Sequence, residues 1–267
     1  MAITQAHLTD SSSGTPGHGF TMGAFTPSAS KLQLVSVYMF TSFGSLPYTG
    51  TLSSGGTGLN FVDVIGSPVT VGGVLQCWVF RAMKSGGLGS GTPAFSVGSA
   101  SGDVWIWSVD EFDGVDTSGT DGAGAVLQSA SGTQTNVGTN NPATATLGAF
   151  SSVNNGTYLA GGVRDGSGLL SNMTTPSGFT NIIDTLIGPG RYESLVAWRA
   201  DNNLSNSITP NSAGGAPSVI AIALELAAGG AAPADTFAAA WSSQGTLLTR
   251  GRPSMVASGA NPSPRLP

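Results

Sequence analysis

The chain has 267 residues and a formal net charge of −5, and only 9 % of its residues are charged. The basic residues are scattered, which argues against nucleic acid as a partner, because nucleic-acid binding needs clustered Lys and Arg. Hydrophobic residues make up 40 % of the chain, and 40 residues are Gly. This composition excludes a disordered chain and favours many short strands joined by turns.

The N-terminal segment, residues 1–30, is polar and rich in turn-forming residues. We predict a loop-rich lead-in there. The segment has neither the basic start nor the apolar stretch of a signal peptide. The longest apolar stretch, residues 218–232, is too short to cross a bilayer and contains Glu225. We therefore expect no membrane partner, and a protein that stays in the cytoplasm or leaves the cell by assembly or lysis.

The middle of the chain is a series of short apolar segments. Residues 31–40 are apolar on both faces from Leu34 onward, as in a strand that is covered on both sides. Further strand-like segments span residues 74–83, 103–112, 125–129, 143–150, 156–164, 179–187, 194–200 and 218–226. Gly, Pro, Asn or Ser separates nearly all of them. We predict an all-β domain over residues 31–228, a two-sheet antiparallel β-sandwich of jelly-roll type.

Two stretches of this domain resemble each other. In each, a strand that ends in Arg-Ala is followed by a strand that ends in Glu and a large apolar residue. The motifs are Arg81-Ala82 with Glu111-Phe112, and Arg199-Ala200 with Glu225-Leu226. Either β-hairpins in general look alike, or these are equivalent hairpins from two halves of the sandwich. In the second case each Arg could pair with the Glu of the neighbouring strand.

An acidic cluster follows the predicted strand 103–112. Its spacing does not match an EF-hand, which needs a Glu at a fixed distance after the central Gly. A looser calcium site is an alternative, built from Asp113, Asp116 and Asp121. A second alternative is a metal site that combines the two histidines with an acid, namely His7, His18 and Asp10. We interpret the cluster as the solvated end of a core strand and predict no bound metal.

The sequence offers little catalytic chemistry. Asp110 and Glu111 are adjacent, so on a strand their side chains point to opposite faces. Glu111 and Glu225 could act together on a sugar bond only if their strands were neighbours. The motifs of serine hydrolases, zinc proteases and phosphate loops do not occur, and Cys77, the single cysteine, lies in an apolar segment typical of a buried thiol. We predict no enzymatic activity and no cofactor.

Four of the five tryptophans lie in predicted strands. Trp105 and Trp107 are two positions apart and therefore share one face. They form either a platform on which a sugar ring stacks or part of the core between the sheets, and we favour the core because large aromatic side chains contribute most when buried.

The C-terminal segment, residues 229–267, differs from the rest of the chain. It has many Pro, Ala and Gly residues and almost no strand pattern, and one short helix after Asp235 is plausible. We predict an extended, mostly irregular arm. An apolar anchor and three basic side chains favour binding to a partner subunit: Trp241, Arg250, Arg252 and Arg265.

The order of these features resembles the β-sandwich virion proteins of tailed bacteriophages, which include capsid decoration proteins and minor tail or fibre-associated proteins. The resemblance rests on LQLVSVYMF, the Trp-bearing strand that ends in Arg-Ala, VDEFDGVD, GTYLAGG, LVAWRA and AIALEL, over residues 20–228. It implies a virion location, other virion proteins such as major capsid or tail proteins as partners, and a homo-oligomer. It carries no catalytic residues.

We therefore expect a non-enzymatic capsid decoration subunit that is attached to its neighbours through the arm. The alternative is a minor tail or fibre-associated protein whose sandwich binds a host-surface glycan.

Overall fold

The computed structural model describes residues 2–14, 17–41, 46–64, 68–98, 104–135, 140–188 and 190–230. These residues form strands, turns and loops without a helix, which confirms the all-β prediction. The chain divides into two units at Gly229–Gly230. Trp241, Arg250, Arg252, Arg265 and the predicted helix after Asp235 lie outside the described residues.

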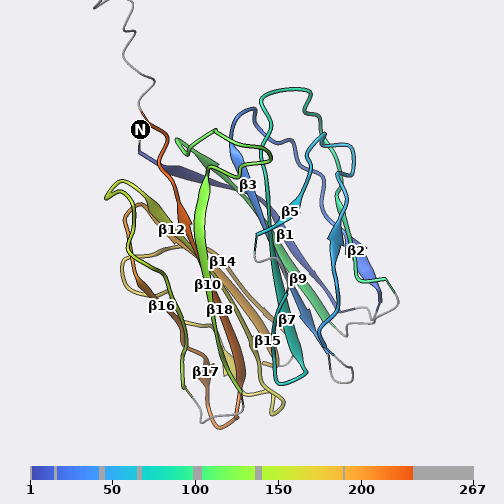
Figure 1. Ribbon diagram of the computed structural model, residues 1–267. Coiled ribbons are helices and arrows are strands. Elements are labelled where there is room, and N and C mark those ends of the chain that lie inside the picture. The colour runs from blue at the N-terminus through green and yellow to red at the C-terminus, as the bar shows by residue number, and fades with distance from the viewer. Residues whose placement is uncertain are drawn as a thin grey trace, which may run out of the picture. The chain divides into compact units, whose positions relative to one another are not determined.

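The first half of the chain forms one antiparallel main sheet (Figure 1). Its three central strands are buried on both faces rather than alternating, because both faces are covered; all nine residues of β3 are buried. In spatial order the strands are β1 (Thr4–Ser13), β9 (Val104–Asp113), β3 (Leu32–Phe40), β7 (Leu75–Ala82) and β5 (Val62–Asp63), with β6 (Val69–Val71) also beside β7.

The second half forms the other main sheet with the same strand order. In space the strands are β10 (Val126–Gln134), β18 (Ser218–Leu226), β12 (Gly156–Arg164), β15 (Tyr192–Arg199) and β14 (Thr180–Ile187). The central three strands correspond without a register shift. Leu32 pairs with Phe112, and its equivalent Gly156 pairs with Leu226. The two halves of the body are therefore an internal structural repeat.

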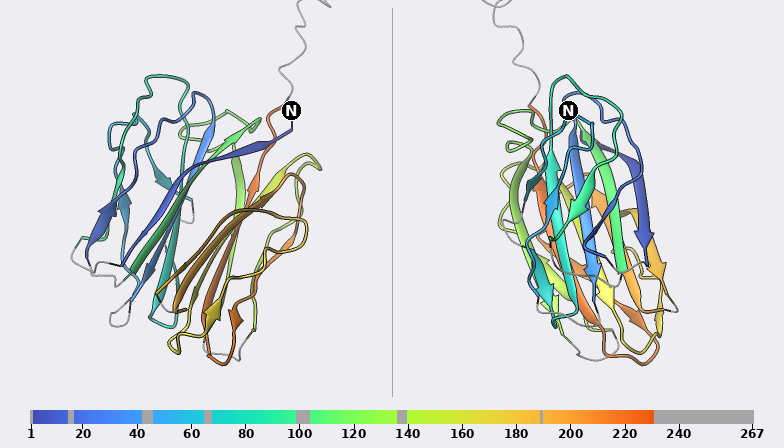
Figure 2. Two further views of the ribbon diagram at one scale, coloured as in Figure 1. Left: turned by 180° about the vertical axis from the view of Figure 1, so that it is seen from behind. Right: turned by 90° about the vertical axis from the view of Figure 1, so that its right-hand side faces the viewer.

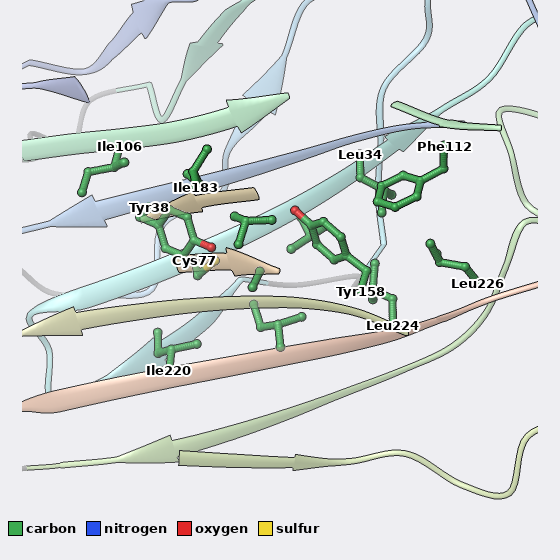
Figure 3. Close-up of a cluster of buried hydrophobic side chains, with 14 of the residues drawn as sticks. Leu34, Tyr38, Cys77, Ile106, Phe112, Tyr158, Ile183, Ile220, Leu224 and Leu226 are labelled. Atoms are coloured by element: carbon green, nitrogen blue, oxygen red, sulfur yellow. The ribbon is translucent and has the colours of Figure 1, made fainter. Parts of the chain in front are cut away.

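The inner faces of the two main sheets pack against each other (Figure 2). Figure 3 shows side chains of the first half, such as Tyr38 and Phe112, pointing toward side chains of the second half, such as Tyr158 and Leu224. Cys77 is buried in this core, as predicted. The two-sheet sandwich is thus confirmed.

Each main sheet also has a cover of short strands over its outer face. In the first half the cover is a three-stranded sheet of β2 (Gly19–Thr21), β8 (Ala94–Ser96) and β4 (Thr51–Leu52). In the second half it consists of two pairs, β11 (Ala143–Thr146) with β16 (Ser205–Ile208) and β13 (Leu170–Ser171) with β17 (Asn211–Ser212). Each cover encloses an outer core whose side chains come from its own half.

Three details differ from the sequence predictions. The lead-in is not loop-rich throughout, because residues 4–13 form the edge strand β1, whose polar side chains gave no hydrophobic signal. The connectivity differs from a jelly roll, because the chain completes one main sheet before it begins the other. The body continues past residue 228, because the Gly229 N–H donates a hydrogen bond to the Gly114 carbonyl at 2.7 Å.

Candidate functional site

The most unusual chemistry in the body is a set of buried carboxylates. All three glutamates of the chain are buried, although Glu is rarely buried without a partner: Glu111, Glu193 and Glu225. Each accepts a hydrogen bond from the backbone N–H of a loop residue: Ser28, Met173 and Ser151, respectively. These carboxylates therefore attach loops to the main sheets.

Glu111 lies on β9 and faces the outer side of its sheet. One carboxylate oxygen accepts from the Ser28 N–H at 2.7 Å and from Gln33 Nε2 at 2.9 Å. The other oxygen lies 3.3 Å from the Lys31 ammonium, whose side chain is 31 % exposed. The carboxylate is thus held by two neutral donors and one half-exposed cation.

Glu225 is the equivalent residue on β18, because Glu111 pairs with Gln33 of β3 and Glu225 pairs with Thr157 of β12. It accepts from Asn155 Nδ2 at 2.6 Å, from the Ser151 N–H at 3.3 Å and from the Gln128 side chain. All of these donors are neutral. A buried carboxylate needs such partners, since an unpaired buried charge is very costly.

The sequence hypothesis of a Glu111–Glu225 catalytic pair is wrong. Along β9, Phe112 belongs to the core between the sheets and Val109 to the outer core, so Glu111 faces outward. On β18, Leu226 and Ala223 place Glu225 on the outer face of the other sheet in the same way. The two carboxylates therefore lie on opposite sides of the sandwich and cannot face one bond.

The Arg–Glu pairs that the alternative of equivalent hairpins would allow are not formed. Arg81 donates to the backbone carbonyls of Thr120 and Asp121, and Arg199 pairs with Asp201. The strand register of the repeat explains why the two Arg-Ala motifs are not equivalent. Leu34 and Tyr158 are equivalent, and their partners are Arg81 and Trp198, so the two Arg-Ala motifs are one residue out of register.

His7 forms the second polar site, at the edge of the first main sheet. Its Nδ1 lies 2.8 Å from Oδ1 of the buried Asp110, and its Nε2 lies 2.9 Å from Oδ1 of Asp10. A neutral imidazole has only one N–H, so two carboxylate partners require the charged ring. The hydrogen bond to Asp110 accordingly raises the pKa of His7. Burial raises the pKa of Asp110, against its hydrogen bonds with His7 and Ser108.

The structure does not form the alternative metal site of His7, His18 and Asp10. His7 is already shared between two carboxylates, and His18 lies beside β8, where its carbonyl accepts from the Val97 N–H. Within the described ranges, no three His, Cys, Asp or Glu side chains are grouped so that they could hold a metal ion.

The three aspartates of the calcium hypothesis have separate partners. Asp113 pairs with Lys31 at 3.5 Å, Asp116 accepts from the Ser118 N–H at 2.8 Å, and Asp121 accepts from Asn60 Nδ2 at 2.6 Å. The structure does not bring the three carboxylates together. The acidic segment instead links β9 of the first half to β10 of the second, and the Asp116 N–H donates a hydrogen bond to the Ala227 carbonyl at 2.9 Å.

The glycan platform proposed for Trp105 and Trp107 is wrong. The two side chains are 0 % and 5 % exposed. Phe20 of the cover stacks on the Trp107 ring, with centroids 4.1 Å apart and planes at 15°, and Phe95 lies 5.6 Å from Trp105. Both indoles are therefore core residues, as favoured from the sequence, but in the outer core of the first half rather than between the sheets.

An open cleft of about 480 Å³ lies on the body. It lies between the first half and the segment 114–125, which links β9 to β10. Its walls include Asn60, Met83, Lys84, Ser85, Thr117 and Asp121. Lys84 Nζ donates to the Gly58 carbonyl at 3.1 Å. None of the side chains that line it is aromatic. Such a cleft suits a small hydrophilic ligand and has no nucleophile paired with a base.

No known protein family, no curated protein and no solved structure matches this chain. No helix within the described ranges is long and apolar enough to cross a membrane.

Proposed function

We propose that the protein is a non-enzymatic structural subunit of a bacteriophage particle, a capsid decoration protein that its C-terminal arm attaches to neighbouring subunits. The observation that carries the proposal is a contrast within the chain. The body encloses its own three cores, whereas the segment from residue 231 onward contains Trp241 and three arginines in a sequence too rich in Pro, Gly and Ala to build a core.

The surface of the body supports this division of roles. Among the described residues, only four large hydrophobic side chains are exposed: Leu127, Val153, Leu169 and Leu204. Four such side chains are few, whereas interaction surfaces usually present a large apolar patch. Adhesion through an apolar face of the body is therefore a poorer explanation than adhesion through the arm.

The physical effect of such a subunit is stabilisation of the shell. A ligand that binds only the assembled lattice shifts the equilibrium toward that lattice by mass action. An extended arm suits this role, because it buries a large area and is ordered mainly on assembly. The resemblance to phage β-sandwich virion proteins agrees with this role.

The test is co-sedimentation with phage particles and empty shells that lack the protein. A chain that ends at Gly230 should stay folded by circular dichroism but no longer sediment with shells. Full-length protein with Trp241→Ala, Arg250→Ala and Arg252→Ala should also lose binding, whereas the matched arm variant with Ser243→Ala and Thr246→Ala should bind normally. Equal binding by the truncated chain would contradict the role of the arm, and failure of the full chain to bind would contradict the virion proposal.

The open cleft favours a second candidate function, recognition of a host-surface glycan by a minor tail or fibre-associated protein. Its Asn, Asp, Lys and hydroxyl side chains are the groups that bind sugar hydroxyls. Saturation-transfer NMR against host polysaccharide tests this function. Asp121→Ala should abolish transfer, whereas Asp116→Ala, from the same loop but outside the cleft, should not. Absence of transfer to the wild-type protein would exclude this candidate.

A further inference from the structure

The internal repeat places a buried amide in the first half and a buried carboxyl group in the second half at equivalent positions. Gln76 is the second residue of β7 and lies opposite Met39 of β3. Glu193 is the second residue of β15 and lies opposite Val163 of β12. Met39 and Val163 are themselves the eighth residues of equivalent nine-residue strands. Gln76 and Glu193 therefore occupy the same place, and both are fully buried.

Gln76 shows what this position requires. Its Oε1 accepts from the Tyr48 N–H at 3.0 Å, and its Nε2 donates to the Tyr48 carbonyl at 2.5 Å. One side chain thus attaches the segment after β3 to the sheet by both an acceptor and a donor. The amide is neutral and both of its polar atoms have partners, as a buried polar group needs.

Glu193 performs half of this role. Its Oε1 accepts from the Met173 N–H, in the segment between β13 and β14. Its Oε2 is buried and has no hydrogen-bond partner among the described residues, and the same holds for Oδ1 of Asp184 on β14. Asp184 lies two residues before Leu186, the β14 residue that pairs with Glu193, so the two carboxyl groups are diagonal neighbours on one face of adjacent strands. The other oxygen of Asp184 accepts a hydrogen bond from Asn172 Nδ2 at 3.2 Å.

We propose that Glu193 is protonated at neutral pH and donates its proton to Asp184, so that one shared proton holds the edge strand β14 and the segment at Met173 onto the second main sheet. The protonated carboxyl group is the counterpart of the Gln76 amide, with one acceptor and one donor. The shared proton also gives both orphaned oxygens a partner. Loss of the proton leaves two negative charges on neighbouring strands and opens this edge.

The surroundings favour the neutral form. Val163 of β12 and Leu186 of β14 lie opposite Glu193 in the sheet. Among the described residues, Asp184 is the one titratable group that acts on Glu193. Burial, followed by the hydrogen bond and charge of Asp184, raises the pKa of Glu193 from 4.5 to about 8, against the Met173 N–H, which lowers it.

The sign of the pH effect follows from this shift. The unfolded chain ionises Glu193 near 4.5, whereas the folded chain keeps the proton until about 8. The stabilisation is fully present below the lower value and is lost as the pH rises through the upper one. The β14 edge is therefore closed under acidic and neutral conditions and opens in alkali.

The chain offers a direct test, because it contains only three glutamates. Protein labelled with 13C at the Glu side-chain carboxyl carbon should give three NMR signals, one of which titrates with a midpoint of about 8. That signal should be missing in Glu193→Gln. In Asp184→Asn its midpoint should move down toward the ordinary range, which tests the pair by a variant that leaves Glu193 in place. A Glu193 signal that is already ionised at neutral pH would overturn the proposal.

Reciprocal variants test the equivalence of the two halves. In alkali, Glu193→Gln should unfold at a higher urea concentration than the wild type. The urea midpoint of the wild type should decline between about pH 5 and about pH 9, and that of Glu193→Gln should not. Gln76→Glu should introduce a similar decline through the first half. Equal pH profiles for wild type and Glu193→Gln would contradict the shared proton.

Calcium separates a shared proton from a cation site. If the pair were ionised at neutral pH and bound a divalent cation, CaCl2 would raise the unfolding temperature of the wild type but not that of Glu193→Gln, and the proposal would fall. We expect CaCl2 to change both unfolding temperatures equally.

Discussion

The two halves of the body share a strand order but fill their outer cores with different side chains. The outer core of the first half is aromatic and contains Trp78, Trp105, Trp107, Phe25, Phe80 and Phe95. Among the described residues, the equivalent core of the second half contains no fully buried aromatic ring but five alanines, Ala143, Ala145, Ala197, Ala221 and Ala223. By register, Trp105 corresponds to Val219 and Trp107 to Ala221.

The difference shows that one strand order is compatible with outer cores built from side chains of very different size. Where side chains are small, the cover approaches the sheet closely: a Cβ added at Gly132 would lie 2.0 Å from the Thr144 carbonyl oxygen, and one at Gly161 would lie 2.3 Å from Cγ1 of Ile208. Where indoles fill the space, a three-stranded cover lies over them instead. Both solutions reach a filled interior, which stability requires.

The largest expected effect comes from removing an indole. Trp105→Ala should lower the free energy of unfolding by about 3–5 kcal/mol, because the buried ring leaves a cavity that the rigid sheet cannot close. The matched variant Val219→Ala, at the equivalent position of the second half, should cost only about 2 kcal/mol. Urea denaturation followed by circular dichroism measures both. Equal losses would show that the aromatic core is not tightly packed.

The next effect separates the two equivalent glutamates. Glu225→Gln should cost about 1–3 kcal/mol, because both carboxylate oxygens face donors and the new NH2 group must oppose one of them. Glu111→Gln should cost less, about 1 kcal/mol, because its NH2 group can face Lys31, which is free to turn into solvent. The comparison requires the two unfolding curves at one pH. A larger loss at Glu111 would contradict this account of the donors.

Much of the fold was predictable because its buried strands are continuous apolar segments in the sequence. The segment 31–40, apolar on both faces, predicted a strand covered on both sides, and β3 is buried throughout. Equivalent strands were one of the two alternatives for the repeated Glu, and Glu111 and Glu225 do occupy equivalent positions. Strand β1 was missed because an edge strand needs only backbone pairing, and its residues are exposed or half-buried.

The polar sites were harder to predict because they depend on register between distant strands. The contact between His7 and Asp110 joins residues 103 positions apart and requires the antiparallel pairing of β1 with β9. The predicted strand 194–200 begins one residue after Glu193, so the position was not compared with Gln76. A comparison of hairpins in register, rather than of Arg-Ala motifs, would have aligned the two residues.

His7 gives the third prediction, since its polar site has no counterpart in the second half, where Leu224 replaces Asp110. His7→Gln should cost about 1.5–3 kcal/mol below the ordinary pKa of His, because a charged hydrogen-bonded pair is lost. The raised pKa of His7 means that its contribution is complete in acid and declines as the pH rises through the folded value. The difference between wild type and variant should therefore shrink in alkali. A difference that grows with pH would contradict the charged ring.

The smallest effect concerns Lys31, the cation among the described partners of Glu111 and Glu225. Lys31→Ala should cost less than about 1 kcal/mol, because its half-exposed ammonium is screened by water and salt. The remaining donors, Ser28 and Gln33, still satisfy one oxygen of Glu111, and the other is open to solvent along the path that Lys31 vacates. Added NaCl at about 0.5 M should reduce the difference further. A loss as large as that of Glu225→Gln would mean that the first half depends on charge where the second half uses neutral donors alone.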